Sequence, residues 1–372
     1  MKIGIACYPT FGGSGVVATE LGHELARRGH YVHFITYAPP SRLNAFADRV
    51  AYHEVTVPSY PLFQYAPYDL ALATRIVDVA EHEGLDLLHA HYALPHAISA
   101  HLAREMLAPR KLAVVTTLHG TDITIVGQDR SYLPITRFGI DRSDAVTAVS
   151  EHLRKVTLEV FRPSKTIEVI PNFIDPERWK PAAEGSVCRV APQGRKVLLH
   201  VSNFRPVKRV LDVVEVFDRV NRKVPAWLVM VGDGPDRPAA EELCRAKGLS
   251  RSATFLGNMP FLEAVVPAAD LYLLPSDSES FGLSALEAQA CGVPVLGYDV
   301  GGLPEVVEKG VTGFLRPVGD VDGLTDEAVR LLSDPARYAA VSKASTERAV
   351  RLFDADSIVG RYLSLYERVL AR

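Results

Sequence analysis

Short apolar runs alternate with helical stretches along nearly the whole 372-residue chain. The runs are rich in Val, Ile and Leu and lack a clean polar alternation, which is typical of strands buried on both faces of a parallel sheet. The strands predicted in the first half are Ile3–Cys7, Tyr31–Thr36, Leu85–His89, Leu112–Leu118, Ala145–Val149 and Ile167–Ile170. Those predicted in the second half are Val197–Val201, Trp227–Val231, Thr254–Leu256, Leu271–Leu274 and Val293–Leu296. The predicted fold class is α/β, with two parallel-sheet units and right-handed crossovers.

Helices are predicted between these strands, among them Val16–Arg28, Val210–Val220 and Pro238–Lys247. The polar segment Pro181–Arg195, which Pro and Gly interrupt, is predicted as a loop near a domain boundary. The last helix carries an apolar stripe at helical spacing. Its members are Val359, Tyr362, Leu363, Tyr366, Val369 and Leu370. This stripe must dock on a core, and the pattern alone leaves open whether that core belongs to its own domain.

Charge and composition exclude several classes of protein. Lys and Arg number 41 and Asp and Glu 44, so the net charge of -3 gives no reason to expect nucleic acid or an anionic membrane as a partner. No apolar run approaches the roughly 20 residues of a membrane span, and the N-terminus reads as a strand and not as a signal peptide. Cys7, Cys188, Cys244 and Cys291 form no CxxC pair. That spacing argues against a disulfide framework or a zinc site and indicates a reducing cytoplasm.

A glycine loop follows the first predicted strand and precedes a helix. Gly13 to Ala18 matches the GxGxxA pattern, in which a helix N-terminus attracts an anion and glycines let it approach. An NAD site would also need an acidic residue at the end of the second strand. That strand ends Ile35-Thr36-Tyr37-Ala38-Pro39-Pro40, so NAD is not favoured. A structural glycine turn remains the alternative.

Histidines gather at the ends of two predicted strands. His119 opens the segment His-Gly-Thr-Asp at the carboxyl end of a strand, where open α/β sheets bind ligands. Such a histidine is either a structural hydrogen-bonding group or a catalytic one. His89 and His91 are expected on one face of a strand, but no third ligand accompanies them at metal-binding spacing.

In the second half, Arg205 and Lys208 follow the first predicted strand. Two cations at a strand's carboxyl end can clamp a diphosphate and balance leaving-group charge, although a solvated basic turn is the alternative. Glu279 and Glu287 stand eight residues apart after the strand Leu271–Leu274. If a helix opens between them, its free N–H groups face an anion and Glu287 can accept two hydrogen bonds from a ribose diol.

These motifs resemble those of the family-4 glycosyltransferases of the GT-B fold. Glu279 to Glu287 matches the family's EX7E motif, Arg205 and Lys208 its phosphate-binding pair, and Gly12 to Gly15 its glycine loop. The matching segments are CYPTFGGSGVVATELGHELA, HAHYALPHAISA, TTLHGTDITIVG, IPNFID, VSNFRPVKR, VGDGP, ESFGLSALEAQACGVP and GGLPEV. The first three segments resemble most closely the family members that transfer N-acetylglucosamine from UDP-GlcNAc to L-malate. Pro206 stands where the family often has a basic residue.

The resemblance implies two Rossmann-like domains that face each other across a cleft. Residues 1–173 would form the acceptor-binding domain, residues 174–353 the UDP-sugar-binding domain, and the helix at about 354–372 would pack back on the first. Donor binding is implied for Gly13, Ser14, Gly15, Asn203, Arg205, Lys208, Glu279, Phe281, Gly282, Leu283 and Glu287. Catalytic roles are implied for His119, Arg205, Lys208 and Glu279. No metal ligand and no cofactor are expected.

An acceptor such as L-malate carries two carboxylates, which a pocket must neutralise. Arg137 is the predicted carboxylate clamp because a guanidinium binds a carboxylate bidentately. The alternative is a surface ion pair between Arg137 and Asp141. Ser14, Tyr92 and Thr121 are predicted to offer hydroxyl donors to the acceptor.

The activity implied is retaining transfer of N-acetylglucosamine to the hydroxyl of L-malate, the first step of bacillithiol biosynthesis, by a cytoplasmic enzyme. The leaving phosphate would accept the acceptor's proton, and no metal would be needed. Three alternatives stay open: transfer to another anionic acceptor such as inositol phosphate, epimerisation of UDP-GlcNAc, and non-catalytic binding of a nucleotide sugar. No nucleic acid and no membrane span are expected, and assembly into a homo-oligomer is left open.

Overall fold

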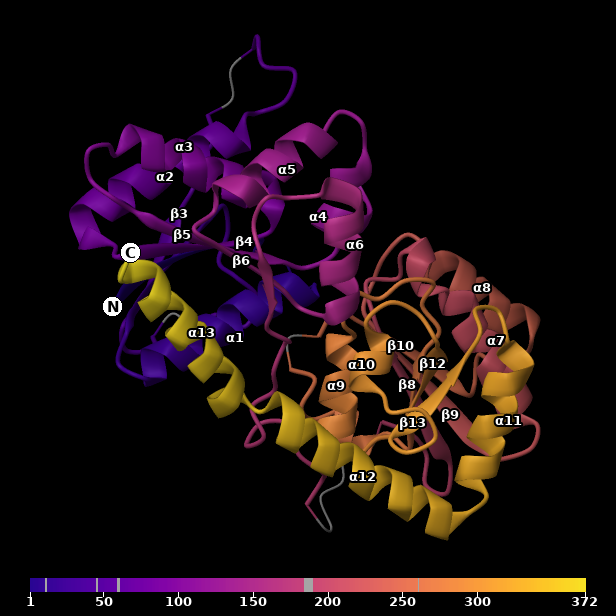
Figure 1. Cartoon of the computed structure of the whole chain (residues 1–372). Helices are drawn as coiled ribbons and strands as arrows, with labels where there is room; N and C mark the ends of the chain where they lie inside the picture. The colour runs from indigo at the N-terminus through magenta and orange to yellow at the C-terminus, as the bar shows by residue number, and fades with distance from the viewer. Residues whose placement is uncertain (11, 45, 59–60, 184–189, 260) are drawn as a thin grey trace. The chain divides into compact units, whose positions relative to one another are not determined.

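The computed structural model describes residues 1–10, 12–44, 46–58, 61–183, 190–259 and 261–372 (Figure 1). The chain divides into two compact units. Unit 1 comprises Met1–Asn172 and Asp356–Arg372, and unit 2 comprises Phe173–Ala355. The middle of the predicted boundary loop, residues 184–189 with Cys188, lies outside the described residues.

Unit 1 is built on a seven-stranded parallel sheet in the order β3-β2-β1-β4-β5-β6-β7. Its strands are β1 (Lys2–Ala6), β2 (Tyr31–Thr36), β3 (Val50–Glu54), β4 (Leu87–His91), β5 (Ala113–Leu118), β6 (Ala145–Ala148) and β7 (Ile167–Val169). The strand order reverses between β1 and β4. In open sheets of this kind, ligands bind beyond the carboxyl ends of the strands at that reversal.

Helices cover the faces of this sheet. They are α1 (Gly13–Arg27), α2 (Tyr68–Val79), α3 (Ile98–Met106), α4 (Thr121–Thr124), α5 (Leu133–Arg142), α6 (Glu151–Phe161) and α13 (Ala355–Leu370), with π-helical turns η1 (Ala80–Gly84) and η2 (Ala93–Ala97) and a 3-10 turn η3 (Val126–Gln128). Figure 1 shows α2 and α3 next to each other. Leu72 and Ile76 of α2 pack with Leu88 and Val114 of the sheet, so β4 and β5 are buried strands.

Unit 2 has a six-stranded parallel sheet in the order β10-β9-β8-β11-β12-β13. Its strands are β8 (Lys196–Val201), β9 (Ala226–Val231), β10 (Ala253–Gly257), β11 (Leu271–Leu274), β12 (Val295–Tyr298) and β13 (Gly313–Arg316). Its helices are α7 (Val210–Asn221), α8 (Arg237–Ala246), α9 (Leu283–Ala290), α10 (Leu303–Val306), α11 (Val321–Leu332) and α12 (Pro335–Phe353), with 3-10 turns η4 (Pro206–Lys208) and η5 (Val266–Ala268). The strand order again reverses between β8 and β11, which places the predicted phosphate and EX7E motifs at the reversal.

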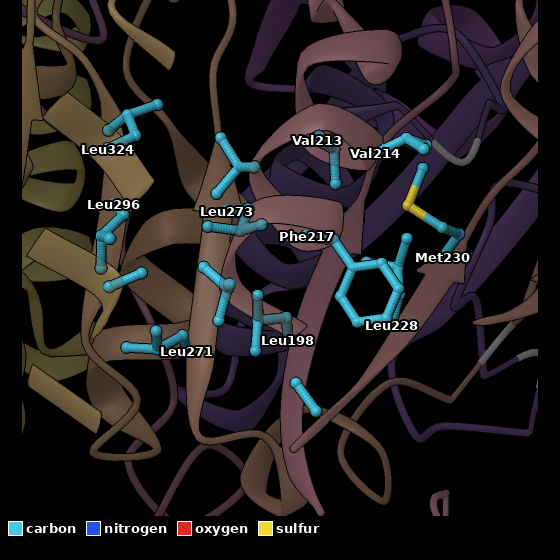
Figure 2. Close-up of a cluster of buried hydrophobic side chains, with 14 of the residues drawn as sticks. Leu198, Val213, Val214, Phe217, Leu228, Met230, Leu271, Leu273, Leu296 and Leu324 are labelled. Carbon is cyan, nitrogen blue, oxygen red and sulfur yellow. The ribbon is translucent and has the colours of Figure 1, made fainter. Parts of the chain in front are cut away.

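The core of unit 2 lies between this sheet and α7. Figure 2 shows Val213, Val214 and Phe217 of α7 beside Leu198 and Leu228 of the sheet. All five side chains are fully buried, and a buried Leu or Phe contributes about 1.5–3 kcal/mol to folding. This packing fixes β8 and α7, and therefore the loop between them.

The predicted strands agree with the structure except at four places. The strand predicted at Leu85–His89 is β4, which lies two residues later, at Leu87–His91, and this register brings His91 into the strand. The strand predicted at Val293–Leu296 is likewise later, at Val295–Tyr298. Two strands, β3 and β13, were not predicted. β3 is half-buried because it pairs only with β2 at the sheet edge, and its sequence VAYHE has little of the apolar character of a buried strand.

The C-terminal helix α13 packs in unit 1. Tyr362 and Tyr366 are fully buried, and the Tyr366 hydroxyl lies 2.7 Å from Nδ1 of His89. The buried face differs from the predicted stripe: Ile358 and Leu365 are buried although they were not predicted, whereas Leu363 is only half-buried and Leu370 is exposed at the helix end. Within the described part of the chain, no helix is long and apolar enough to cross a membrane.

Candidate functional site

In unit 2, the loops after β8 and β11 bring a cation and a carboxylate together. The strands are neighbours, so their carboxyl ends lie side by side. Nζ of Lys208 donates a hydrogen bond of 2.6 Å to Oε1 of Glu279. The Ser276 hydroxyl donates to the same oxygen at 2.8 Å. The predicted phosphate-binding cation and the first EX7E carboxylate are therefore ion-paired.

The same two loops are also tied together through their backbones. The N–H of Asp277 donates to the carbonyl of Val207 at 2.8 Å. Arg209 bridges the loops by donating to Asp277 at 3.2 Å and to Asp212 at 2.7 Å. The hydrogen bond to Asp212 is the main cause that raises the pKa of Arg209. These contacts hold Lys208 and Glu279 on one rigid edge.

His200, a buried histidine near the end of β8 that was not predicted as a site residue, orders the start of the loop that follows this strand. Both ring nitrogens of His200 are hydrogen-bonded: Nδ1 lies 2.8 Å from the carbonyl oxygen of Leu273, and Nε2 lies 2.7 Å from the hydroxyl of Ser202. Because a carbonyl only accepts, Nδ1 carries the proton and Ser202 donates to Nε2. Ser202 in turn accepts from the N–H of Phe204 at 3.2 Å. Burial lowers the pKa of His200 to about 4, so the imidazole stays neutral at neutral pH.

Helix α9 begins where the EX7E motif predicts it. Gly282 is its N-cap, with a φ of 95° that side chains rarely tolerate. The first N–H groups of α9 have no partner within the helix, and an anion can accept from them. Glu287 lies one turn further and is 5% exposed. Phe281 and Gly282 are buried, and Leu283 is half-buried.

A second glycine holds the backbone of Glu279. The N–H of Gly302 donates to the carbonyl of Glu279 at 2.8 Å. A Cβ atom on Gly301, whose φ is 57°, would lie only 1.9 Å from that carbonyl oxygen. The segment Gly301-Gly302 thus lets the chain approach Glu279 closely and fixes its loop.

Arg205 and Asn203 stand at the exposed rim of the same loop. Within the part of the chain that the structure describes, the Arg205 guanidinium has no ion-pair partner, which leaves it available for an anion. Unit 2 therefore combines one exposed cation, one paired cation, a helix N-terminus and a buried carboxylate. Such an arrangement can hold the diphosphate and the ribose of a nucleotide.

In unit 1, the glycine loop opens α1 as predicted. Gly12 is the N-cap, and its carbonyl already accepts from the N–H of Gly15 at 3.1 Å. A Cβ on Gly15 would lie 2.6 Å from the carbonyl of Tyr8 and 2.5 Å from that of Thr10, so only glycine fits there. The N–H groups of Gly13 and Ser14, in the first turn of α1, have no acceptor within the helix and can donate to an anion. Gly13 is exposed and Ser14 half-exposed.

His119 is one end of a buried chain of side chains. Its Nε2 lies 2.8 Å from Nδ1 of His91, and the two rings stack with centroids 5.0 Å apart. His91 packs on His89 at 4.3 Å, which confirms that these two histidines share one strand face. His89 bonds the hydroxyls of Tyr366 and Thr117, both at 2.7 Å.

Burial keeps these imidazoles uncharged. It lowers the pKa of His89 and of His119 to about 3, and it also lowers that of His91, which its histidine neighbours lower further. His119 at neutral pH is therefore a neutral hydrogen-bonding group held in place by His91. The sequence indicated each histidine but not this contact.

Asp122 is a further residue of the site that the sequence motif contained but whose role was not predicted. Its carboxylate is 2% exposed and accepts from the N–H groups of Ala93 at 2.9 Å, Gly120 at 2.9 Å and His119 at 3.3 Å. Burial raises its pKa to about 6 against these hydrogen bonds. Asp122 thereby fixes the His119 loop to η2. The sequence offered one signal for this role, namely that Asp122 follows the strand-end residue His119 by three positions.

The predicted acceptor residues are placed at different depths in unit 1. Tyr92 follows β4 with a φ of 98°, a strained backbone for a bulky residue, and its ring lies 5.3 Å from that of His119. Thr121 is exposed at the start of α4. Arg137, on α5, has a 52% exposed side chain whose Nε lies 3.7 Å from Asp141, so the ion pair weighed as the alternative is present.

Comparison with known proteins decides the family. Two family models match consecutive parts of the chain: "Glycosyltransferase Family 4" over residues 11–178 and "Glycosyl transferases group 1" over residues 189–348. The N-acetyl-alpha-D-glucosaminyl L-malate synthase of Bacillus anthracis is 46% identical over 372 residues, covering 100% of this chain and 97% of that protein. This chain is a family-4 glycosyltransferase.

Other relatives and solved structures agree with that assignment. A D-inositol 3-phosphate glycosyltransferase of Mycolicibacterium paratuberculosis is 30% identical over 96% of this chain and 86% of its own length. HepE from Anabaena, solved in complex with UDP and glucose, superimposes with a TM-score of 0.82 at 21% identity, over 99% of both chains. Sucrose-phosphate synthase from Thermosynechococcus elongatus gives 0.80 at 23% identity, over 100% of this chain and 99% of its own. This family-4 glycosyltransferase therefore has the GT-B fold.

Proposed function

We propose that this glycosyltransferase transfers N-acetylglucosamine from UDP-GlcNAc to the hydroxyl of L-malate, with retention at the anomeric carbon. The observation that carries the proposal is the 46% identity, over the full length, to an enzyme named for that product. The identity to an inositol 3-phosphate glycosyltransferase is 30%, so that acceptor is not favoured. Such a transfer is the first step expected of bacillithiol biosynthesis.

In the proposed reaction, the bond between the anomeric carbon and the β-phosphate oxygen breaks, and UDP leaves with the electron pair. The malate hydroxyl oxygen bonds to the same carbon from the same face, and its proton passes to the leaving phosphate. Arg205, Lys208 and the N-terminus of α9 would stabilise the charge that develops on the diphosphate. Glu287 would bind the ribose diol, and Glu279 a sugar hydroxyl.

We predict that the reaction needs no divalent metal. Asp277 and Glu279 lie in the loop after β11, next to the loop after β8 that carries Arg205 and Lys208 (the phosphate loop). Each is already held by a cation, Arg209 and Lys208 respectively. Exhaustive treatment with EDTA should leave kcat unchanged. A loss of activity that magnesium or manganese restores would show that this prediction is wrong.

The Glu287→Ala variant should bind UDP-GlcNAc more weakly by about 1–3 kcal/mol, the range for hydrogen bonds that involve a charged group. Calorimetric titration with the donor measures the effect. A matched control is Glu242→Ala, which removes an exposed carboxylate on α8 that pairs with Arg245. If both variants bind the donor as the wild type does, Glu287 does not hold the ribose.

For the acceptor, Arg137 remains the proposed carboxylate clamp, although its guanidinium lies 3.7 Å from Asp141. The variant Arg137→Ala should raise the KM for L-malate strongly and leave donor affinity nearly unchanged. Asp141→Asn is the matched variant, because it frees the guanidinium without removing it and should not raise this KM. A KM for L-malate that stays within about twofold in Arg137→Ala, a difference of less than about 0.5 kcal/mol, would exclude the clamp.

A panel of acceptors tests the proposed function against its rivals. With UDP-GlcNAc as donor, kcat/KM should be highest for L-malate and much lower for inositol 3-phosphate. An epimerase would convert the donor without any acceptor, and a binding protein would convert nothing. A preference for inositol 3-phosphate would overturn the assignment of the acceptor but not that of the family.

The setting of the reaction is also a proposal. Cys7, Cys244 and Cys291 are free and buried, which suits a reducing cytoplasm. We place the enzyme there, acting on small-molecule substrates.

A further inference from the structure

Two histidines and a glutamate meet in unit 1, away from the strand ends that carry the candidate site. They are His33 of β2, His53 of β3 and Glu83 of η1. Nδ1 of His33 lies 3.0 Å from Nε2 of His53. One ligand atom from each of the three residues can be chosen so that all lie within 4.8 Å of one another.

The sheet register explains why these residues converge. His33 pairs with Ala51 in the neighbouring strand, so His53, two residues further on, points to the same face. On the other side His33 is opposite Gly4 of β1, which has no side chain to occupy that face. Glu83 approaches from the turn that precedes β4, where Nζ of Lys2 holds its backbone carbonyl at 2.6 Å.

The chemistry of the cluster suits zinc. Two imidazole nitrogens and one carboxylate oxygen form a ligand set that zinc prefers, with a fourth position left for water. Zinc–nitrogen bonds of about 2.0–2.1 Å in a tetrahedron place two nitrogens about 3.3 Å apart, close to the 3.0 Å seen here. His33 is buried, whereas His53 and Glu83 are half-buried. An ion can therefore reach the cluster from solvent, and a change of rotamer can bring the Glu83 carboxylate to the ion.

Charged side chains surround the two imidazoles. Lys2 lies near His33 and Arg75 near His53, and the carboxylates of Glu83 and Asp78 balance these two cations. Arg75 is neutralised by its ion pair with Asp78.

We propose that His33, His53 and Glu83 form a structural zinc site. The ion would link the edge strand β3, whose only neighbour in the sheet is β2, to the turn before β4. This link stabilises unit 1 and takes no part in glycosyl transfer. Removing the ion should therefore lower Tm without lowering kcat at the assay temperature.

Calorimetric titration of the metal-free full chain with zinc chloride, without substrates, tests the site. We expect one zinc per chain, and affinity lower by more than about tenfold in His53→Gln and in Glu83→Gln. The matched control His82→Gln removes an exposed histidine next to Glu83 and should bind as the wild type does. At about a hundred times Kd, zinc should raise the Tm of the wild type by about 5–10 °C. Equal binding by wild type, His53→Gln and Glu83→Gln, or no stoichiometric binding, would overturn the proposal.

Cobalt substitution identifies the ligand atoms. Co²⁺ in this site should give the visible absorption of a tetrahedral complex with nitrogen and oxygen ligands, and both ligand variants should lose it. An additional near-ultraviolet band from thiolate-to-cobalt charge transfer would assign the ion to cysteines and contradict the site. Circular dichroism of His53→Gln and Glu83→Gln verifies that the variants are folded.

Discussion

The variant Lys208→Ala should lose activity by about 10²–10³-fold in kcat, the loss seen when one group that stabilises transition-state charge is removed. Lys208 forms an ion pair with Glu279, and in the proposed reaction its positive charge stabilises the leaving diphosphate. The substitution removes that charge and also leaves the carboxylate of Glu279 with Ser276 but without its cation. Steady-state kinetics at saturating UDP-GlcNAc and L-malate measures the effect.

Lys196→Ala is the matched control for this variant. Lys196 is also ion-paired, with Nζ 2.8 Å from Asp270, but it lies at the start of β8, at the end opposite the phosphate loop. Its removal should leave kcat unchanged. If Lys208→Ala keeps kcat within about tenfold of the wild type, less than about 1.4 kcal/mol of barrier, Lys208 does not stabilise the departing diphosphate.

Acid should destabilise unit 1 by at least about 5 kcal/mol between pH 7 and pH 5. The cause is the set of buried neutral imidazoles around His119. Burial lowers the pKa of His89 and His119 to about 3 and that of His96 to about 4, from 6.5. Below pH 6.5 these histidines bind protons in the unfolded chain but stay neutral in the folded chain, so the free energy of unfolding falls as the pH falls.

The size of this effect follows from proton linkage. Each of the three histidines costs about 2 kcal/mol at pH 5. Asp122 acts in the opposite direction, because its pKa is raised to about 6 and the folded state binds its proton first, which returns about 1 kcal/mol. The remainder is comparable with the whole stability of a typical domain, about 5–15 kcal/mol.

Denaturation by urea at the two pH values measures this loss. Both tryptophans, Trp179 and Trp227, belong to unit 2, whose single histidine is His200. Tryptophan fluorescence should therefore show a smaller loss than circular dichroism, which follows both units. Equal stability at pH 7 and pH 5 would contradict the account of the buried imidazoles.

The variant His96→Leu isolates one member of the set. In the described part of the chain neither ring nitrogen of His96 makes a hydrogen bond of good geometry, although the backbone of His91 lies close enough to raise its pKa. Leucine therefore removes a titrating group at little cost in hydrogen bonding. The acid-induced loss should shrink by about 2 kcal/mol. A variant with the full wild-type pH dependence would show that His96 does not contribute.

Much of the fold was predictable because burial leaves a local signature. β2 and β11 are short runs dominated by apolar residues, and their predicted bounds, Tyr31–Thr36 and Leu271–Leu274, match the structure. The start of α9 at Gly282 was predictable because a glycine turn followed a buried strand. The edge strand β3 was not, because half-buried strands need few apolar residues.

The contacts that organise the candidate site had no local signature. Lys208 and Glu279 are 71 residues apart in sequence, and His89 and Tyr366 are 277 apart. Both contacts depend on the tertiary fold, which brings β8 next to β11 and packs α13 in unit 1. The contact between His91 and His119 could have been predicted from the sequence, because both residues stand at the carboxyl ends of strands that are neighbours in the parallel sheet.

The most direct test of the account is to incubate the purified enzyme with UDP-GlcNAc, with and without L-malate, and to determine the mass and anomeric configuration of the products. The account predicts one new product, malate that carries a single N-acetylglucosamine in α linkage, formed only when L-malate is present and in step with UDP release. A β-linked product, an epimerised donor, or UDP released without a glycosylated malate would contradict it.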